Sequence, residues 1–170
     1  FVLMNLPESA PAGGFPMAKL SHCCLELSDQ WILAEYQEAL KAAREKMAAY
    51  NPAAAADVLY GFLWDKFCDW YVELAKNRLQ GIEGESGQAV QTILIHVLSG
   101  TLKMLHPFMP FITEELFLAL KPYTAETGDF ILRSGLPDFD YDWSNDAARK
   151  NMGTLMEIIV AIRTLRSQLN

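Results

Sequence analysis

Apolar residues recur at the spacing of an α-helix through most of this 170-residue chain, and proline or glycine interrupts them. Side chains three and four positions apart lie on one face of a helix, so this spacing predicts helices with one buried face. It predicts helices over 29–49, about 52–79 and 88–105, a shorter helix over 110–120, and a last one that follows Ser144. Since no strand pattern competes, the sequence predicts an all-α fold, an antiparallel bundle of four to five helices.

Residues that favour helix ends stand at these boundaries. Ser28 is expected to cap the first helix, because a serine oxygen accepts hydrogen bonds from free amide groups there. Asn51 and Pro52 are a typical cap and first residue for the second helix. Pro107 is expected to end the third helix, and Pro110 to begin the fourth.

Prolines and glycines break up residues 122–143, which predicts an irregular segment. Within it, Phe130-Ile131-Leu132 is expected to be a short extended piece. Residues 1–6 are interpreted as the end of a helix, without an initiator methionine, and residues 7–16 as a loop. We therefore expect residues 1–170 to form a single helical domain, a fragment of a larger protein.

Composition excludes several classes of protein. With 51% hydrophobic and 21% charged residues, the chain can build a core and is not a disordered tail. No uncharged apolar run is long enough to predict a membrane span. The net charge of −7 argues against a broad basic field for nucleic acid, so any RNA contact would have to be local.

Residues that could bind a metal or take part in catalysis are scattered along the sequence. The three cysteines, Cys23, Cys24 and Cys68, are an odd number with no metal-binding spacing, which favours reduced thiols. His96 lies in an apolar helix and is interpreted as a core residue, and His106 as a boundary residue. The sequence therefore predicts neither a catalytic centre nor a metal site.

The aromatic-rich stretch in the second helix predicts two faces. At helical spacing, one stripe forms a core face: Leu59, Leu63, Phe67, Trp70 and Leu74. The opposite face carries Cys68, Asp69 and Lys76, with Val72 among these charges. An apolar side chain there has two interpretations. Another helix covers Val72, or Val72 contacts a flat apolar group of a partner, such as a nucleobase.

Several stretches resemble one family. They are FLWDKFCDWYVELAK, LKMLHPFMPFITEEL, LSDQWILAEY, AIRTLRSQLN and the opening FVLMNL. Together they are similar to the C-terminal helical domain of valyl-tRNA synthetases. The resemblance implies the anticodon-binding domain of a class I synthetase, which binds tRNA(Val) and works with the catalytic domain of the same chain.

The resemblance also implies features of the whole enzyme that lie outside these residues. The whole enzyme loads valine onto its tRNA with ATP and magnesium, but the HIGH-type and KMSKS-type signatures of that chemistry are absent here, so no cofactor is expected in these residues. The resemblance implies a monomer without a membrane partner, in the cytoplasm or, for an organellar enzyme, in the organelle matrix.

In such enzymes, an aromatic at the position of Phe1 and an apolar residue at the position of Val72 read the anticodon. The resemblance and the helix face together nominate an anticodon-binding set: Phe1, Cys68, Asp69, Val72 and Lys76. Positive charge nominates candidate phosphate contacts: Lys66, Arg78, Arg163 and Arg166. Two alternatives stay open, a helical scaffold between domains or proteins without direct RNA contact, and an independent enzyme.

Overall fold

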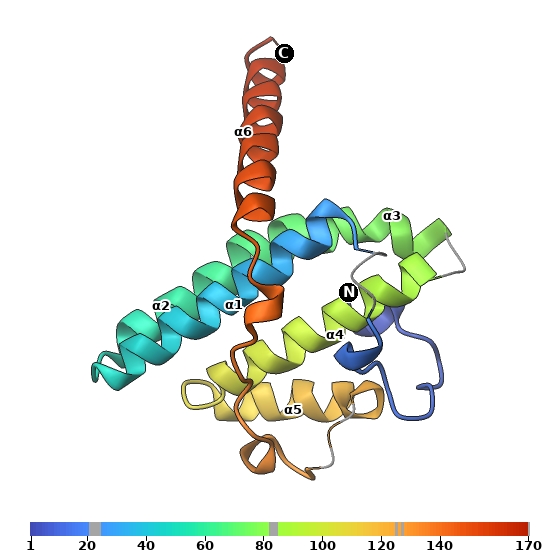
Figure 1. Ribbon diagram of the computed structural model, residues 1–170, viewed down its shortest axis with the longest axis vertical. Helices are drawn as coiled ribbons and strands as arrows, with labels where there is room; N and C mark the ends of the chain where they lie inside the picture. The colour runs from blue at the N-terminus through green and yellow to red at the C-terminus, as the bar shows by residue number, and fades with distance from the viewer. Residues whose placement is uncertain (21–24, 82–84, 125, 127, 170) are drawn as a thin grey trace.

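The structure is a computed structural model that describes residues 1–20, 25–81, 85–124, 126 and 128–169. The described residues form helices and loops without any strand, which confirms the all-α prediction (Figure 1). No helix among them is both long enough and apolar enough to pass through a lipid bilayer. Cys23 and Cys24 lie outside the described residues.

Helix α1 spans Leu27–Ala48 and is buried along most of its length. Its cap is Glu26 and not the predicted Ser28. The Glu26 side chain accepts from a backbone amide of the first turn, while the Asp29 carboxylate accepts from the Glu26 amide at 3.0 Å. This reciprocal arrangement satisfies two free amides at once, which leaves no role for Ser28 as the cap.

A rod of three consecutive helices returns antiparallel to α1: α2 (Pro52–Gly61), the π-helix η4 (Phe62–Val72) and α3 (Glu73–Gly81). As predicted, Asn51 caps α2, with its side chain accepting from the Ala54 amide at 3.1 Å, and Pro52 is the first helical residue. The tight turn before it places Tyr50 at φ 54°. α1 and α2 lie side by side (Figure 1).

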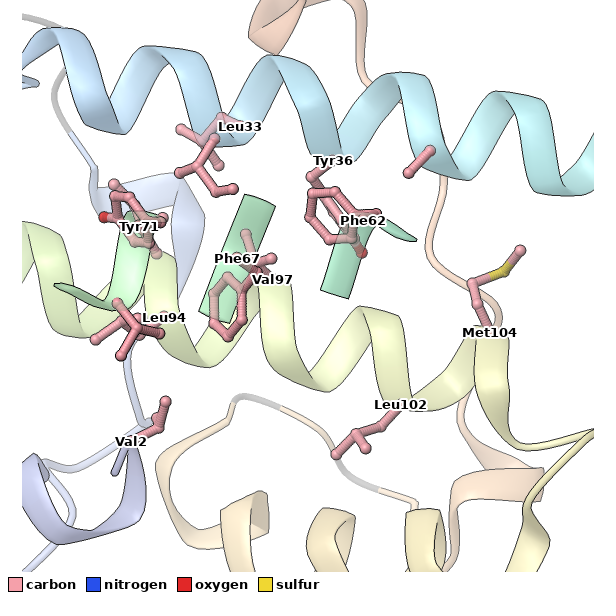
Figure 2. Close-up of a cluster of buried hydrophobic side chains, with 14 of the residues drawn as sticks. Val2, Leu33, Tyr36, Phe62, Phe67, Tyr71, Leu94, Val97, Leu102 and Met104 are labelled. Carbon is pink, nitrogen blue, oxygen red and sulfur yellow. The ribbon is translucent and has the colours of Figure 1, made fainter. Parts of the chain in front are cut away.

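Helices α4 (Glu85–Leu105) and α5 (Pro110–Leu120) form the next layer, and both predicted proline boundaries are confirmed. His106 joins the two helices, because its Nδ1 atom lies 2.8 Å from the Thr113 hydroxyl. The core lies between α1, η4 and α4, where aromatic and aliphatic side chains meet: Leu33, Tyr36, Phe67, Tyr71, Leu94 and Val97 (Figure 2).

The segment after α5 is irregular, as predicted, and contains three single 3-10 turns: η5 (Lys121–Tyr123), η6 (Ile131–Arg133) and η7 (Tyr141–Trp143). The expected extended piece at 130–132 is therefore wrong, since η6 forms there. Ile131 is buried and its amide donates to the Glu114 carboxylate at 3.2 Å. This anchor to α5 favours a turn over an extended chain.

The N-terminal residues form two short 3-10 turns, η1 (Leu3–Asn5) and η2 (Met17–Lys19), separated by a loop. The Tyr123 hydroxyl donates to the Pro7 carbonyl at 2.9 Å, and the Phe15 amide donates to the Tyr123 carbonyl at 2.9 Å. The loop is thereby fastened to the end of α5. Val2 enters the main core, which fixes the position of the first residue.

Helix α6 spans Asp146–Gln168 and crosses α1, then projects away from the body of the molecule (Figure 1). Its cap is Asn145, whose side chain accepts from the Ala148 amide at 2.9 Å, one residue later than the predicted Ser144. Asn145 also donates to Gln30 at 3.0 Å, and this contact with α1 selects it over its neighbour. Only the first turns of α6 are buried, at Ala148 and Met152.

Candidate nucleic-acid interface

The π-helix decides which side chains of the aromatic-rich stretch are buried. Phe62, Phe67 and Val72 follow each other at intervals of five residues, and all three lie in the core. A π-helix bonds each residue to the fifth one along and so turns less per residue than an α-helix. The buried face therefore drifts away from the stripe that α-helical spacing predicts.

This drift corrects two sequence-based expectations. Leu59 and Phe67 are buried as predicted, and Leu63 and Trp70 are partly buried and packed against the core. Leu74, the last residue of the predicted core stripe, is instead exposed. Val72, expected to point outward, has only 8% of its surface exposed and belongs to the core. Of its two interpretations, burial under neighbouring elements is the one that the structure supports.

The predicted site residues gather where the N-terminus meets η4 and α3. Phe1 keeps 42% of its surface exposed, and the Lys76 ammonium lies 5.4 Å from the centre of its ring. Asn5 donates from its side chain to the Phe1 carbonyl at 2.9 Å, which holds the first turn in place. The Lys76 ammonium is also 2.5 Å from the Glu73 carboxylate, so it lies between an acidic group and an aromatic ring.

Cys68 lies within reach of the same corner. Its pKa is raised by burial and by the neighbouring Asp69 carboxylate. Asp69 itself is exposed. The structure therefore brings Phe1, Cys68, Asp69 and Lys76 to one corner, called here the Phe1–Lys76 patch. Val72 lies between Cys68 and Lys76 in the chain, but beneath the surface.

This patch offers a flat, half-exposed ring with a cation above it and a carboxylate nearby. An exposed aromatic ring can stack on an unpaired base, since every base has a flat π-face. A carboxylate can accept a hydrogen bond from the amino group of a base. The patch is small and local, as the net charge of −7 requires of any contact with RNA.

Arg78, one of the four candidate phosphate contacts, is buried and fully engaged inside the protein. Its Nη1 atom contacts both carboxylate oxygens of Asp29, at 2.7 and 2.8 Å, and its Nε atom donates to the Ser86 hydroxyl at 2.9 Å. Glu26 lies 3.3 Å from the same guanidinium. The expectation of an exposed charge at Arg78 is therefore wrong, because Asp29 needs a buried counter-charge.

Lys66 is also paired. Its ammonium contacts the Glu35 carboxylate, which Arg149 of α6 contacts from the other side at 3.0 Å. Burial raises the pKa of Glu35, but the hydrogen bonds and charges of Lys66 and Arg149 outweigh it and hold the pKa below its usual value. Lys66 therefore joins η4 to α1 and α6 through this carboxylate.

The other two candidate phosphate contacts lie on α6. The Arg163 guanidinium is 5.5 Å from the centre of the Trp70 ring, a cation–π contact that joins α6 to η4. Arg166 is exposed farther along the projecting part of the helix. The structure records no contact between either arginine and the Phe1–Lys76 patch. The four basic candidates thus do not form one basic cluster.

The structure contains two further features that the sequence does not predict. Tyr60 and Trp64 are exposed and stack on each other, with ring centres 6.3 Å apart and planes inclined by 7°. Their spacing of four residues was the available signal. A pocket of about 140 Å³ lies where α1 meets the start of α6, and no local sequence pattern announces it. Its lining combines residues far apart in the chain: Leu25, Gln30, Asp142, Trp143 and Asn145.

Ionisable groups elsewhere serve the fold. His96 has its pKa lowered to about 4 by burial and by the charge of Lys103, and its ring meets the Tyr36 ring edge-on at 5.5 Å. It is therefore neutral at neutral pH, as expected for a core histidine. In the part of the chain that the structure describes, no group of three or more metal-binding side chains comes together.

Comparison with known proteins identifies the domain. The family model "Anticodon-binding domain of tRNA ligase" matches residues 29–170. A valine–tRNA ligase of Carboxydothermus hydrogenoformans is 42% identical over 170 residues, and one of Fervidobacterium nodosum is 37% identical over 170 residues. One of Thermosynechococcus vestitus is 39% identical over 180 residues.

Each alignment covers nearly all of this chain, 99% to 100%, but the chain spans only 18% of the length of these curated relatives. The family match lies over α1 to α6, the same helices that build the core and carry most of the patch. The chain belongs to the anticodon-binding domain family of tRNA ligases.

Proposed function

We propose that this domain binds the anticodon loop of tRNA(Val) as part of a valine–tRNA ligase, with an unpaired base stacked on Phe1. The observation that carries the proposal is the half-exposed Phe1 ring beside Lys76, in a chain whose family binds anticodons. The similarity to three valine–tRNA ligases supports tRNA(Val) over other tRNAs.

Each member of the proposed site has a separate role. Phe1 supplies the stacking surface, and Lys76 supplies a positive charge over one face of its ring. Asp69 accepts from a base amino group, and half-buried Cys68 forms part of the floor. Val72 packs beneath them, so its part in the site is support and not contact with the base. Arg163 remains as a phosphate contact, whereas Lys66 and Arg78 do not, because each is paired with a carboxylate of this domain.

The rest of the enzyme completes the activity. We place the catalytic domain on the same polypeptide, where ATP and magnesium serve valine activation, and the whole as a monomer in the cytoplasm or in an organelle matrix. Light scattering of the full-length enzyme tests the monomer. A mass of two chains at working concentration would contradict it.

The stacking role is tested with the isolated tRNA(Val) anticodon stem-loop and the full-length enzyme. Phe1→Ala is expected to weaken binding by roughly tenfold, because base–aromatic stacking contributes ~1–3 kcal/mol per base. Met4→Ala is the matched control, since Met4 is an exposed apolar residue of the same turn. Equal affinities of the two variants would refute the stacking role.

The alternative is a scaffold that positions other domains without touching RNA. The acidic net charge and the internal pairing of Lys66 and Arg78 are the observations that favour it. A scaffold predicts that NMR signals of the Phe1–Lys76 patch stay unchanged when the stem-loop is added to the chain. Shifts centred on Phe1, Asp69 and Lys76 exclude it.

A further inference from the structure

The projecting part of α6 carries an exposed apolar stripe, called here the α6 seam. Its members alternate at intervals of three and four residues, and each exposes between 42% and 86% of its surface: Leu155, Ile158, Ile162, Leu165 and Leu169. Figure 1 shows this part of the helix standing clear of the bundle. The stripe is apolar throughout and has no cover among the described residues.

The seam does not face the body of the protein. The side of α6 that contacts the body carries Met152 in the core and Arg163 on Trp70. At 3.6 residues per turn, the seam lies about 100° around the helix from these residues. Burial against the bundle therefore accounts for one stripe of α6 and leaves the seam unexplained.

Alternation of three and four residues is the pattern of a helix that packs lengthwise against another helix, with each side chain inserted between those of its partner. The 14 steps from Leu155 to Leu169 correspond to about 21 Å at a rise of 1.5 Å per residue. Five branched apolar side chains line this length. Such a surface fits one amphipathic helix of about four turns.

We propose that the α6 seam packs against an amphipathic helix of the same polypeptide, supplied from outside residues 1–170 and carrying acidic residues along its flank. Arg166 lies about 60° around the helix from the seam and is the basic residue on its flank, whereas Arg163 faces Trp70 on the body. Acidic flanking residues on the partner helix would complement the positive far end of the seam.

A second copy of this chain fits the seam less well. In an antiparallel pair centred on Ile162, Glu157 would face Ser167, so no ion pair forms, and in a parallel pair Arg166 would face Arg166. Five side chains on one helix also fall short of the ~800 Å² per partner of a stable interface between separate molecules. A helix on the same chain needs less area, because linkage gives an effective concentration of the order of millimolar.

The length of the relatives agrees with a partner on the same polypeptide. The chain spans 18% of the curated valine–tRNA ligases that it matches, so these relatives contain ample further sequence for such a helix. The inference rests on the proposal that this domain is part of a ligase of that kind. It does not rest on the anticodon site, because the seam contains none of the residues of the Phe1–Lys76 patch.

Photo-cross-linking in the full-length enzyme identifies the occupant. The photoreactive residue p-benzoylphenylalanine replaces Leu165, and as a control Ser167, which lies on another side of the helix. The expected result is a cross-link at position 165 to a peptide of the same chain outside residues 1–170 that contains Asp or Glu. A product with the mass of two chains, a cross-link to bound tRNA, or no more product than at position 167 would overturn the proposal.

Hydrogen exchange provides the second readout. Leu165→Glu in the full-length enzyme is expected to speed amide exchange over 155–169 by roughly tenfold or more, because the seam loses its cover. Ser167→Glu adds the same charge away from the seam and should leave the rates unchanged. Equal rates in the two variants contradict the proposal. Stem-loop affinity of the Phe1→Ala variant is measured independently, so failure of the anticodon site and failure of the seam are distinguishable.

Discussion

The Nη1 atom of Arg78 lies 2.7 and 2.8 Å from the two carboxylate oxygens of Asp29, and the Asp29 side chain is wholly inaccessible to solvent. The Tyr71 hydroxyl donates to the same carboxylate at 2.8 Å. This buried group ties the start of α1 to η4 and α3. Residues 42 and 49 positions apart thereby hold the corner that carries the Phe1–Lys76 patch.

Loss of this buried pair should destabilise the fold strongly. Asp29→Asn leaves the Arg78 charge without its main partner, and removal of one member of a buried pair costs roughly 3–5 kcal/mol. Urea denaturation measures the free energy of unfolding. The control is Asp129→Asn, which breaks an exposed pair with Lys121 at 3.4 Å and should change that free energy by only ~0–1 kcal/mol. Equal effects of the two substitutions would contradict the structural role of Asp29.

Close approach of α4 to α1 requires glycine at position 100. A Cβ atom there would overlap the Tyr36 hydroxyl, so Gly100→Ala should lower the free energy of unfolding by roughly 1–3 kcal/mol, as overpacking does. The Tyr36 hydroxyl is buried without a hydrogen-bond partner among the described residues, so Tyr36→Phe should be nearly neutral by itself.

The double variant tests this contact. Tyr36→Phe should recover part of the stability lost in Gly100→Ala, because it removes the overlapping oxygen. Gly153→Ala is the control, since a Cβ atom at that helical position meets nothing within 4 Å and should stabilise by ~1 kcal/mol. If the changes in the free energy of unfolding caused by Tyr36→Phe and Gly100→Ala simply add up in the double variant, the contact does not exist.

Stability should depend on pH through His96. Its pKa falls from 6.5 to about 4 in the folded protein, because of burial and the charge of Lys103. Between these values the unfolded chain binds the additional proton, so stability is full above pH 6.5 and falls as the pH drops toward 4. The loss approaches roughly 3 kcal/mol at the lower limit.

NMR titration of the imidazole and denaturation at several pH values measure this effect. His96→Phe should abolish this part of the pH dependence, whereas the titration of carboxylates remains. A His96 imidazole that titrates near 6.5 in the folded protein would contradict the prediction.

An apolar-to-acidic substitution at Val72 should destabilise the fold, whereas an acidic-to-apolar substitution at Asp69 should not. Val72→Asp places an unpaired carboxylate in the core and should lower the free energy of unfolding by several kcal/mol, of the order of 3 or more. Asp69→Val alters an exposed position and should change it by less than about 0.5 kcal/mol. Thermal and urea denaturation compare them. If Val72→Asp folds with normal stability, Val72 faces solvent after all.

Local signals were sufficient for much of the fold. Asn51, Pro52, Pro107 and Pro110 act through their own backbone and nearest amides, so their positions are readable in the sequence and the structure confirms them. The Ser28 cap was wrong because Asp29 takes part in two arrangements at once. Its carboxylate bonds the Glu26 amide and also binds Arg78 from α3, a contact that no local pattern contains.

The candidate site was predictable in part. The resemblance to valyl-tRNA synthetases nominated Phe1 and Val72, and the predicted outer helix face added Cys68, Asp69 and Lys76. The structure places all of them except buried Val72 at one corner. Positive charge alone nominated Arg78 as a phosphate contact, and the structure buries it. Whether a charge is free depends on which residues of other helices lie beside it, and the sequence does not contain that information in a local form.

By itself, the sequence determined the number and order of the long helices and the family, because apolar spacing, caps and motifs are properties of neighbouring residues. Only the tertiary structure decided which face of the aromatic-rich stretch is buried. The stretch forms a π-helix that packs against α1, and the smaller turn per residue moves Val72 into the core and Leu74 out of it. Burial of its side chains against helices distant in the chain stabilises this conformation. α-Helical periodicity does not encode those contacts.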